Sequence, residues 1–241
     1  MPPLLADASL IGDVTCADAS SSSVLPPAPV LAIYPDAVTE AEEERLVREA
    51  NKWLAKLKWE HGHFDRVITG YRECQKPLRA FTPGSRQILE RLVAFAFPPD
   101  AHVLPVHVLD LHEEGHIMRH VDHVDYSGGS IVGLSLLTGA TMTLHHEPRG
   151  FHDPPRPPAT ADAKGRDGGD MPEPLAADTA PWLALTLPRR SLYVLRGAAR
   201  YEWAHAISRY SGLTADGKPG AEQTPRGRRL AMIFRDAKEE N

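Results

Sequence analysis

The sequence is poor in the features that mark several large protein classes. Only two cysteines, Cys16 and Cys74, occur in 241 residues, and they have neither CxxC nor paired spacing. Such cysteines fit neither a disulfide framework nor a cysteine-based zinc site. The longest apolar runs, such as 131–137, are far shorter than the roughly 20 residues of a membrane-spanning helix. We therefore expect no disulfide scaffold and no membrane span.

The chain also lacks an excess of positive charge. Lys and Arg number 27 against 32 Asp and Glu, which gives a net charge of −5. Proteins that bind duplex DNA hold its phosphates through a basic surface, so we expect no duplex DNA partner. The first basic residue is Arg45, whereas a mitochondrial transit peptide is rich in arginine. From these residues alone, a cytoplasmic location is the expectation.

Composition divides the chain into three parts. Residues 1–30 combine prolines with a serine run and contain no basic residue, which predicts a flexible segment. Residues 31–241 have the size of one globular domain. Within this domain, 148–181 is rich in proline and glycine, which predicts an inserted surface loop. We expect the domain to be a monomer.

Two amphipathic helices are predicted first. Thr39 and Glu42 have capping-box spacing, and apolar residues then recur on one face as far as Leu57. A second helix is predicted from Pro83 to Phe97, with Thr82 as its N-cap. Eight short β-rich segments follow, at 105–111, 116–121, 130–137, 141–146, 182–187, 191–195, 201–206 and 228–235. The fold class is therefore mainly β, a sandwich or jelly roll with two supporting N-terminal helices.

Histidines provide the candidate metal ligands. In His120-Val121-Asp122, strand alternation places an imidazole and a carboxylate on the same face. Two histidines and one carboxylate form the facial set that suits Fe(II). His205 is the candidate third ligand, and its rivals are His107, His116, His145 and His146. A second triplet, His123-Val124-Asp125, competes with the first, and a solvated strand end or a core histidine would explain each feature without a metal.

Arginines on the last strand provide a candidate anion site. Arg229 and Arg235 have the same parity, so both side chains face the same side of the strand. At about 3.3 Å per residue their Cα atoms lie roughly 20 Å apart, which leaves room for a five-carbon dicarboxylate between the guanidinium groups. Tyr193 could donate its hydroxyl to the same ligand. The alternative is an edge strand protected from aggregation by its charges.

In this order, the motifs resemble those of a known family. His120-x-Asp122, Tyr193, His205 and Arg229 with Arg235 resemble the AlkB family of Fe(II)/2-oxoglutarate dioxygenases. The stretches 107–111, 131–137, 191–197 and 225–229 are similar in particular to its mitochondrial homologue-seven branch. The resemblance spans about residues 30–235 and is most specific from Val106 onward.

The resemblance implies a fold, a site and an activity. It implies a double-stranded β-helix in which His120, Asp122 and His205 bind Fe(II). Tyr193 and Arg229 would hold the distal carboxylate of 2-oxoglutarate, and Arg235 would lie near its metal-chelating end. An ungapped count back from Gly133 selects His120 rather than His123 as the ligand.

The resemblance also implies a reaction and a setting. O₂ and 2-oxoglutarate would be consumed to hydroxylate a protein or demethylate RNA in mitochondria, with links to fatty acid metabolism and alkylation-induced programmed necrosis. Segment 59–66 is short and mixed in charge, so it offers little for a clamp on a flipped base. A non-catalytic, metal-binding jelly-roll interaction module is the alternative.

Overall fold

The computed structural model describes residues 15–16, 30–62, 67–147, 182–213 and 219–238. Most of the predicted flexible segment 1–30 and all of the predicted loop 148–181 lie outside these residues. Among the described residues, the helices are α1 (Glu40–Leu54), α2 (Pro83–Ala96) and α3 (Ala198–Tyr201), with a 3-10 turn at Leu78–Ala80. The strands are β1 (Thr15–Cys16), β2 (Val30–Tyr34), β3 (Ile68–Lys76), β4 (Val106–His120), β5 (Ser130–Leu136), β6 (Ala140–His146), β7 (Trp182–Leu187), β8 (Leu192–Arg196), β9 (Trp203–Ile207), β10 (Tyr210–Leu213), β11 (Pro219–Pro225) and β12 (Arg229–Arg235).

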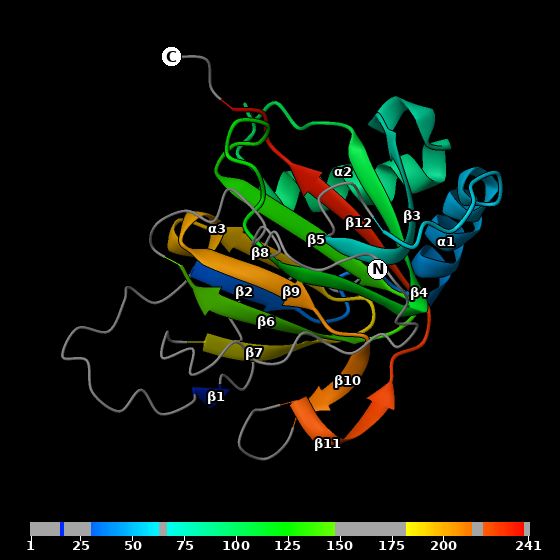
Figure 1. The fold of residues 1–241 in the computed structure, drawn as a ribbon. Helices are drawn as coiled ribbons and strands as arrows, with labels where there is room; N and C mark the ends of the chain where they lie inside the picture. The colour runs from blue at the N-terminus through cyan, green and yellow to red at the C-terminus, as the bar shows by residue number, and fades with distance from the viewer. Residues whose placement is uncertain (1–14, 17–29, 63–66, 148–181, 214–218, 239–241) are drawn as a thin grey trace.

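The main sheet divides at β4. Ten strands form it, in the order β1-β7-β6-β9-β4-β12-β5-β8-β2, with β3 paired to β4. The first half of β4 pairs with β12 and the second half pairs with β9, so the two parts of the sheet diverge from one strand (Figure 1). All of these pairs are antiparallel. This nearly closed arrangement confirms the predicted jelly roll.

The strand prediction was wrong in two respects. The segments 105–111 and 116–121 form one strand, because β3 follows β4 past its polar middle, where the register shifts between Thr69 and Tyr71. The strands β1, β2, β3, β10 and β11 were not predicted. Polar and apolar residues alternate only weakly along β3, so its sequence gives little strand signal. Pairing with β4, rather than local propensity, holds it in the sheet.

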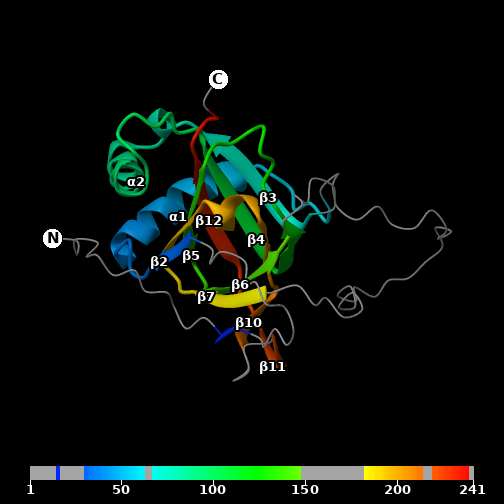
Figure 2. The ribbon, with the colours of Figure 1, turned by 90° about the vertical axis from the view of Figure 1, so that its left-hand side faces the viewer.

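Two helices cover one face of the sheet, as Figure 2 shows from the side. Leu46, Ala50 and Leu54 of α1 and Leu89 of α2 pack in one core with the outward residues of β5, β8 and β12. Residues 230, 232 and 234 of β12 belong to this core, whereas 231 and 233 belong to a second core inside the barrel. Because β12 is buried on both faces, the parity of each residue decides whether it stabilises the fold or lines the interior.

The helix ends differ partly from expectation. The Thr39–Glu42 capping box is present on α1. Thr82, however, makes no side-chain capping bond to α2, since its N–H and hydroxyl both donate to the Glu49 carboxylate at 2.7 Å. Leu57 lies beyond the end of α1 and is exposed. No helix in the described part of the chain is long and apolar enough to span a membrane.

Candidate metal and co-substrate site

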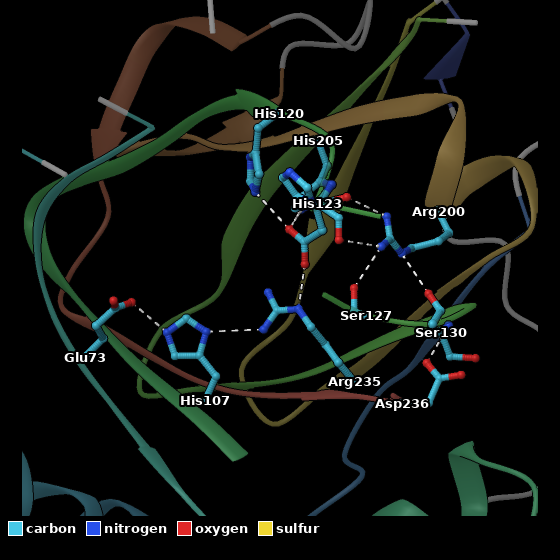
Figure 3. A network of polar contacts seen from close by, with 12 residues as sticks. Glu73, His107, His120, His123, Ser127, Ser130, Arg200, His205, Arg235 and Asp236 are labelled. Atoms are coloured by element: carbon cyan, nitrogen blue, oxygen red, sulfur yellow. Dashed lines mark hydrogen bonds and ion pairs between the residues drawn. The ribbon is translucent and has the colours of Figure 1, made fainter. Parts of the chain in front are cut away.

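Three predicted ligands converge inside the barrel. One donor atom from each of His120, Asp122 and His205 lies within 4.8 Å of the others. His120 pairs with His205 across β4 and β9, and Asp122 follows the end of β4 by two residues. The two rings point toward the same space in Figure 3, with centroids 4.3 Å apart. Strand pairing therefore brings together residues that are 85 positions apart in the sequence.

Hydrogen bonding fixes the orientation of the His120 ring. Its Nδ1 lies 3.0 Å from the backbone carbonyl oxygen of Met118. A carbonyl only accepts, so Nδ1 carries the proton and the lone pair is on Nε2. Nε2 in turn lies 3.1 Å from Asp122 Oδ1. Nε2 and the carboxylate oxygen thus face the same space, which a cation could share between them.

The electrostatic setting keeps His205 and Asp122 free of protons. Burial, together with the neighbouring His120, lowers the pKa of His205 to about 3. Burial alone would raise the pKa of Asp122, but Arg235 and the two histidines hold it well below its usual value. Two imidazoles and one carboxylate are the donor set that suits Fe(II).

The spacing also suits one octahedral ion. Asp122 Oδ1 lies 3.1 Å from His120 Nε2 and 3.7 Å from His205 Nε2. Neighbouring ligands at about 2.1 Å from an octahedral ion are about 3.0 Å apart. The first pair has this spacing, and the second needs to contract by less than 1 Å. Both pairs that include Asp122 are therefore close to the separation that a single metal ion requires.

The competing candidates lie elsewhere. In the second triplet, the side chains of His123 and Asp125 are more than half exposed. His107 is held by Glu73 and Arg235, and within the described residues neither it nor His116, His145 or His146 joins a metal-binding cluster. The ungapped count to His120 thus selected the triplet that meets His205.

Arg229 lies in the barrel interior without a counter-charge. Its Nε donates to Ser135 Oγ at 3.1 Å, and the Tyr193 side chain hydrogen-bonds to it as well. Its Nη2 is buried without a partner, and no Asp or Glu among the described residues pairs with it. Burial lowers the pKa of the guanidinium, and Tyr193 opposes this shift. A buried arginine bonded only to hydroxyls suits an acidic ligand such as the distal carboxylate of 2-oxoglutarate.

Gly133, which the sequence offered only as a reference point for counting, makes room for Tyr193. Gly133 faces Tyr193 directly across β5 and β8, and a Cβ at position 133 would overlap the tyrosine ring. The available signal was a glycine in the middle of an apolar strand, which often marks close approach of another group. Ser135 and Arg200 are further site residues that the sequence did not identify.

Arg235 connects the ligand cluster to the far wall. Its Nε donates to Asp122 Oδ2 at 2.6 Å, so this oxygen is engaged and Oδ1 is left facing the histidines. Its Nη1 lies 3.3 Å from His107 Nδ1, and His107 Nε2 lies 2.7 Å from Glu73 (Figure 3). Because arginine only donates, His107 is the acceptor at Nδ1 and the donor toward Glu73.

Fold and interior together define a class of enzyme. An open set of two imidazoles and a carboxylate leaves coordination positions for further ligands, and the adjacent uncompensated arginine selects an acid. Both properties are those of the Fe(II)/2-oxoglutarate dioxygenases. Sequence comparison agrees, and the chain belongs to the 2OG-Fe(II) oxygenase superfamily, whose profile matches residues 32–235. This family uses Fe(II) and 2-oxoglutarate.

Similar proteins place the chain in the AlkB type of this family. It is 36% identical over 208 residues to the Mus musculus alpha-ketoglutarate-dependent dioxygenase alkB homolog 7, mitochondrial, covering 86% of this chain and 78% of the relative. The Bos taurus protein of the same name is 35% identical with the same coverage. The solved structure of OsALKBH1 aligns with a TM-score of 0.50 at 12% identity, over 88% of this chain and 100% of that chain. At 12% identity, the similarity to OsALKBH1 supports the fold assignment alone.

Proposed function

We propose that this dioxygenase hydroxylates a protein, with His120, Asp122 and His205 as the Fe(II) ligands. The observation that carries the proposal is the convergence of three donor atoms, one from each residue, within 4.8 Å of one another. Tyr193 and Arg229 are proposed to bind the distal carboxylate of 2-oxoglutarate, and Arg235 to lie beside its chelating end. When bound, the iron with 2-oxoglutarate and O₂ supplies the oxidation that inserts oxygen into a C–H bond, releasing succinate and CO₂.

The chain contributes binding and orientation. Met118 holds the His120 ring through its carbonyl oxygen, and Arg235 holds one oxygen of Asp122. These contacts fix the direction of both donor atoms before a metal arrives, which lowers the reorganisation needed on binding. The unpartnered Nη2 of Arg229 supplies a charge-assisted bond to the co-substrate.

The charges beside the site favour a protein over RNA. Two basic side chains near the site are paired with acids, Arg119 with Glu147 and Lys238 with Asp125. Phosphate binding depends on an uncompensated positive surface. Demethylation of RNA is therefore the alternative outcome.

A mitochondrial setting is part of the proposal. It rests on the word mitochondrial in the names of the two relatives described above. The links to fatty acid metabolism and to alkylation-induced necrosis remain predictions from the family resemblance. Fractionation of cells that express the tagged full chain tests the location, and recovery outside mitochondria would contradict it.

Anaerobic absorption spectroscopy tests the site assignment. Fe(II) with 2-oxoglutarate should give a weak visible charge-transfer band in the wild type and in His123→Ala, but not in His205→Ala. His123 is the matched control because it belongs to the exposed triplet. A band that survives in His205→Ala would disprove the ligand assignment.

Succinate release and mass spectrometry then test the substrate. Incubation with mitochondrial protein extract should raise succinate release and add 16 Da to a specific peptide. RNA should bind weakly, with little change between low and moderate salt. Methyl loss from RNA without peptide oxidation would favour the demethylase reading over protein hydroxylation.

A further inference from the structure

A buried arginine ties the two halves of the proposed ligand set together. Arg200 lies on α3, the short helix just before β9, and its side chain is 1% exposed. Its guanidinium bonds to the loop between β4 and β5 through the carbonyl oxygens of Asp122 (2.8 Å), Gly128 (3.2 Å) and His123 (3.5 Å) and the Ser127 hydroxyl (2.8 Å). Figure 3 shows this fan of contacts.

These contacts link the segments that carry two of the proposed ligands, Asp122 and His205. The loop begins at Asp122, which lies beyond the end of β4 and therefore beyond the strand pairing that holds His120. Arg200 precedes His205 by five residues in the segment that delivers this histidine. Arg200 thus bonds to the backbone of Asp122 and also belongs to the segment that carries His205.

The chemistry of Arg200 is unusual for a simple loop contact. All four of its hydrogen-bond acceptors are uncharged, although burying a cation without a carboxylate partner is costly. Burial lowers the pKa of Arg200, and the charge of Asp122 gives the largest opposing effect. An uncharged side chain could satisfy one or two of these acceptors, but only the planar guanidinium can reach all four.

We propose that Arg200 is a positioning residue that holds Asp122 in register with His205 for metal binding. This inference rests on the proposed ligand set. Loss of the guanidinium fork would remove the bond to the Asp122 backbone and leave the bond from Arg235 to its carboxylate. Loss of a group that orients a ligand typically weakens metal binding about 10- to 100-fold.

The test is a Mn(II) titration of the metal-free full chain, followed by electron paramagnetic resonance. Arg200→Lys keeps the charge but not the fork, and we expect its Mn(II) dissociation constant to rise at least tenfold. At saturating Fe(II), its charge-transfer band with 2-oxoglutarate should also be shifted or weakened. A purely structural role would lower the melting temperature without moving either readout.

Arg226→Lys is the matched control. Arg226 is equally buried, and its hydrogen bonds likewise go to uncharged acceptors, the carbonyl oxygens of His112, Gly115, Ser208 and Gly227. None of these belongs to a proposed ligand, so its Mn(II) dissociation constant should stay within twofold of the wild type. Equal loss in both variants would overturn the proposal.

The remaining outcomes separate this inference from the proposed function. If the wild type binds no Mn(II), the ligand set itself is wrong. If the wild type binds and Arg200→Lys binds equally well, only the role of Arg200 is overturned. Should Arg200→Lys not fold, Ser127→Ala removes one acceptor, where threefold weaker binding supports the role and unchanged binding overturns it.

Discussion

Replacement of Arg229 by methionine separates co-substrate binding from stability. The guanidinium is buried, bonds to the hydroxyls of Ser135 and Tyr193, and has one nitrogen without a partner. Methionine keeps the volume and removes the charge. We expect the KM for 2-oxoglutarate to rise roughly 10- to 100-fold, because a hydrogen bond to a charged group contributes about 1.5–3 kcal/mol and about 1.4 kcal/mol is a factor of ten.

The ligand-free stability of this variant should change little. The lost hydrogen bonds to Ser135 and Tyr193 cost about 1 kcal/mol each, and relief of a buried charge without a carboxylate partner offsets them. Urea unfolding of the ligand-free protein should therefore place Arg229→Met within about 1 kcal/mol of the wild type. Succinate release as a function of 2-oxoglutarate concentration gives the KM.

Arg228→Met is the neighbouring control with opposite parity. Arg228 bonds to the buried Asp110 carboxylate at 2.7 and 3.0 Å and to Asn51 at 2.6 Å, on the helix side of β12. This variant should lose about 1–3 kcal/mol of stability, because Asp110 would keep only Arg72. Its KM should be unchanged. A similar KM increase in both variants would refute the assignment of Arg229 and the parity argument with it.

Three further changes give distinct expected outcomes. Gly133→Ala should displace the Tyr193 ring and raise the KM for 2-oxoglutarate, and a crystal structure with the ring unmoved would contradict this. Tyr193→Phe removes one hydroxyl from the same carboxylate site, so its KM should rise by a smaller factor than that of Arg229→Met, as measured by succinate release. Below pH 6.5 the unfolded chain protonates His205 while the folded chain, with a pKa of about 3, does not. Between pH 7 and 5 the metal-free wild type should therefore lose roughly 2 kcal/mol relative to His205→Leu in urea unfolding, and parallel pH curves would exclude this linkage.

The elements with strong local signals were predictable from the sequence. The capping box and apolar stripe located α1, and proline with the next apolar stripe located α2. The parity of β12 was also predictable, since alternation alone placed Arg229 and Arg235 on one face. The strand β3 was not predictable, because its polar residues are stabilised by tertiary partners. One of these partners is Asp110, which accepts a hydrogen bond from Arg72.

The site was predictable to the extent that residue chemistry and order reveal it. The six predicted site residues lie in the barrel interior or at its ligand cluster, but only strand pairing brings His205 to His120. Ser135 and Arg200 escaped notice because a serine or an arginine carries no local signal of its partners. Their positions depend on β5 facing β12 and on α3 facing the loop after β4.

The proposed site carries positive charge that a bound dicarboxylate would neutralise. Arg229 is buried without an acidic partner among the described residues, and Arg235 pairs with Asp122 beside it. Binding of Fe(II) alone would increase this positive charge, whereas 2-oxoglutarate brings two negative charges to the same space. Electrostatic repulsion in a low-dielectric interior is strong, so each ligand should favour the binding of the other. If Arg229 and Arg235 bind the dicarboxylate as proposed, the metal should therefore bind more tightly in the presence of 2-oxoglutarate than in its absence, and titration of the wild type with Mn(II) with and without 2-oxoglutarate measures the difference.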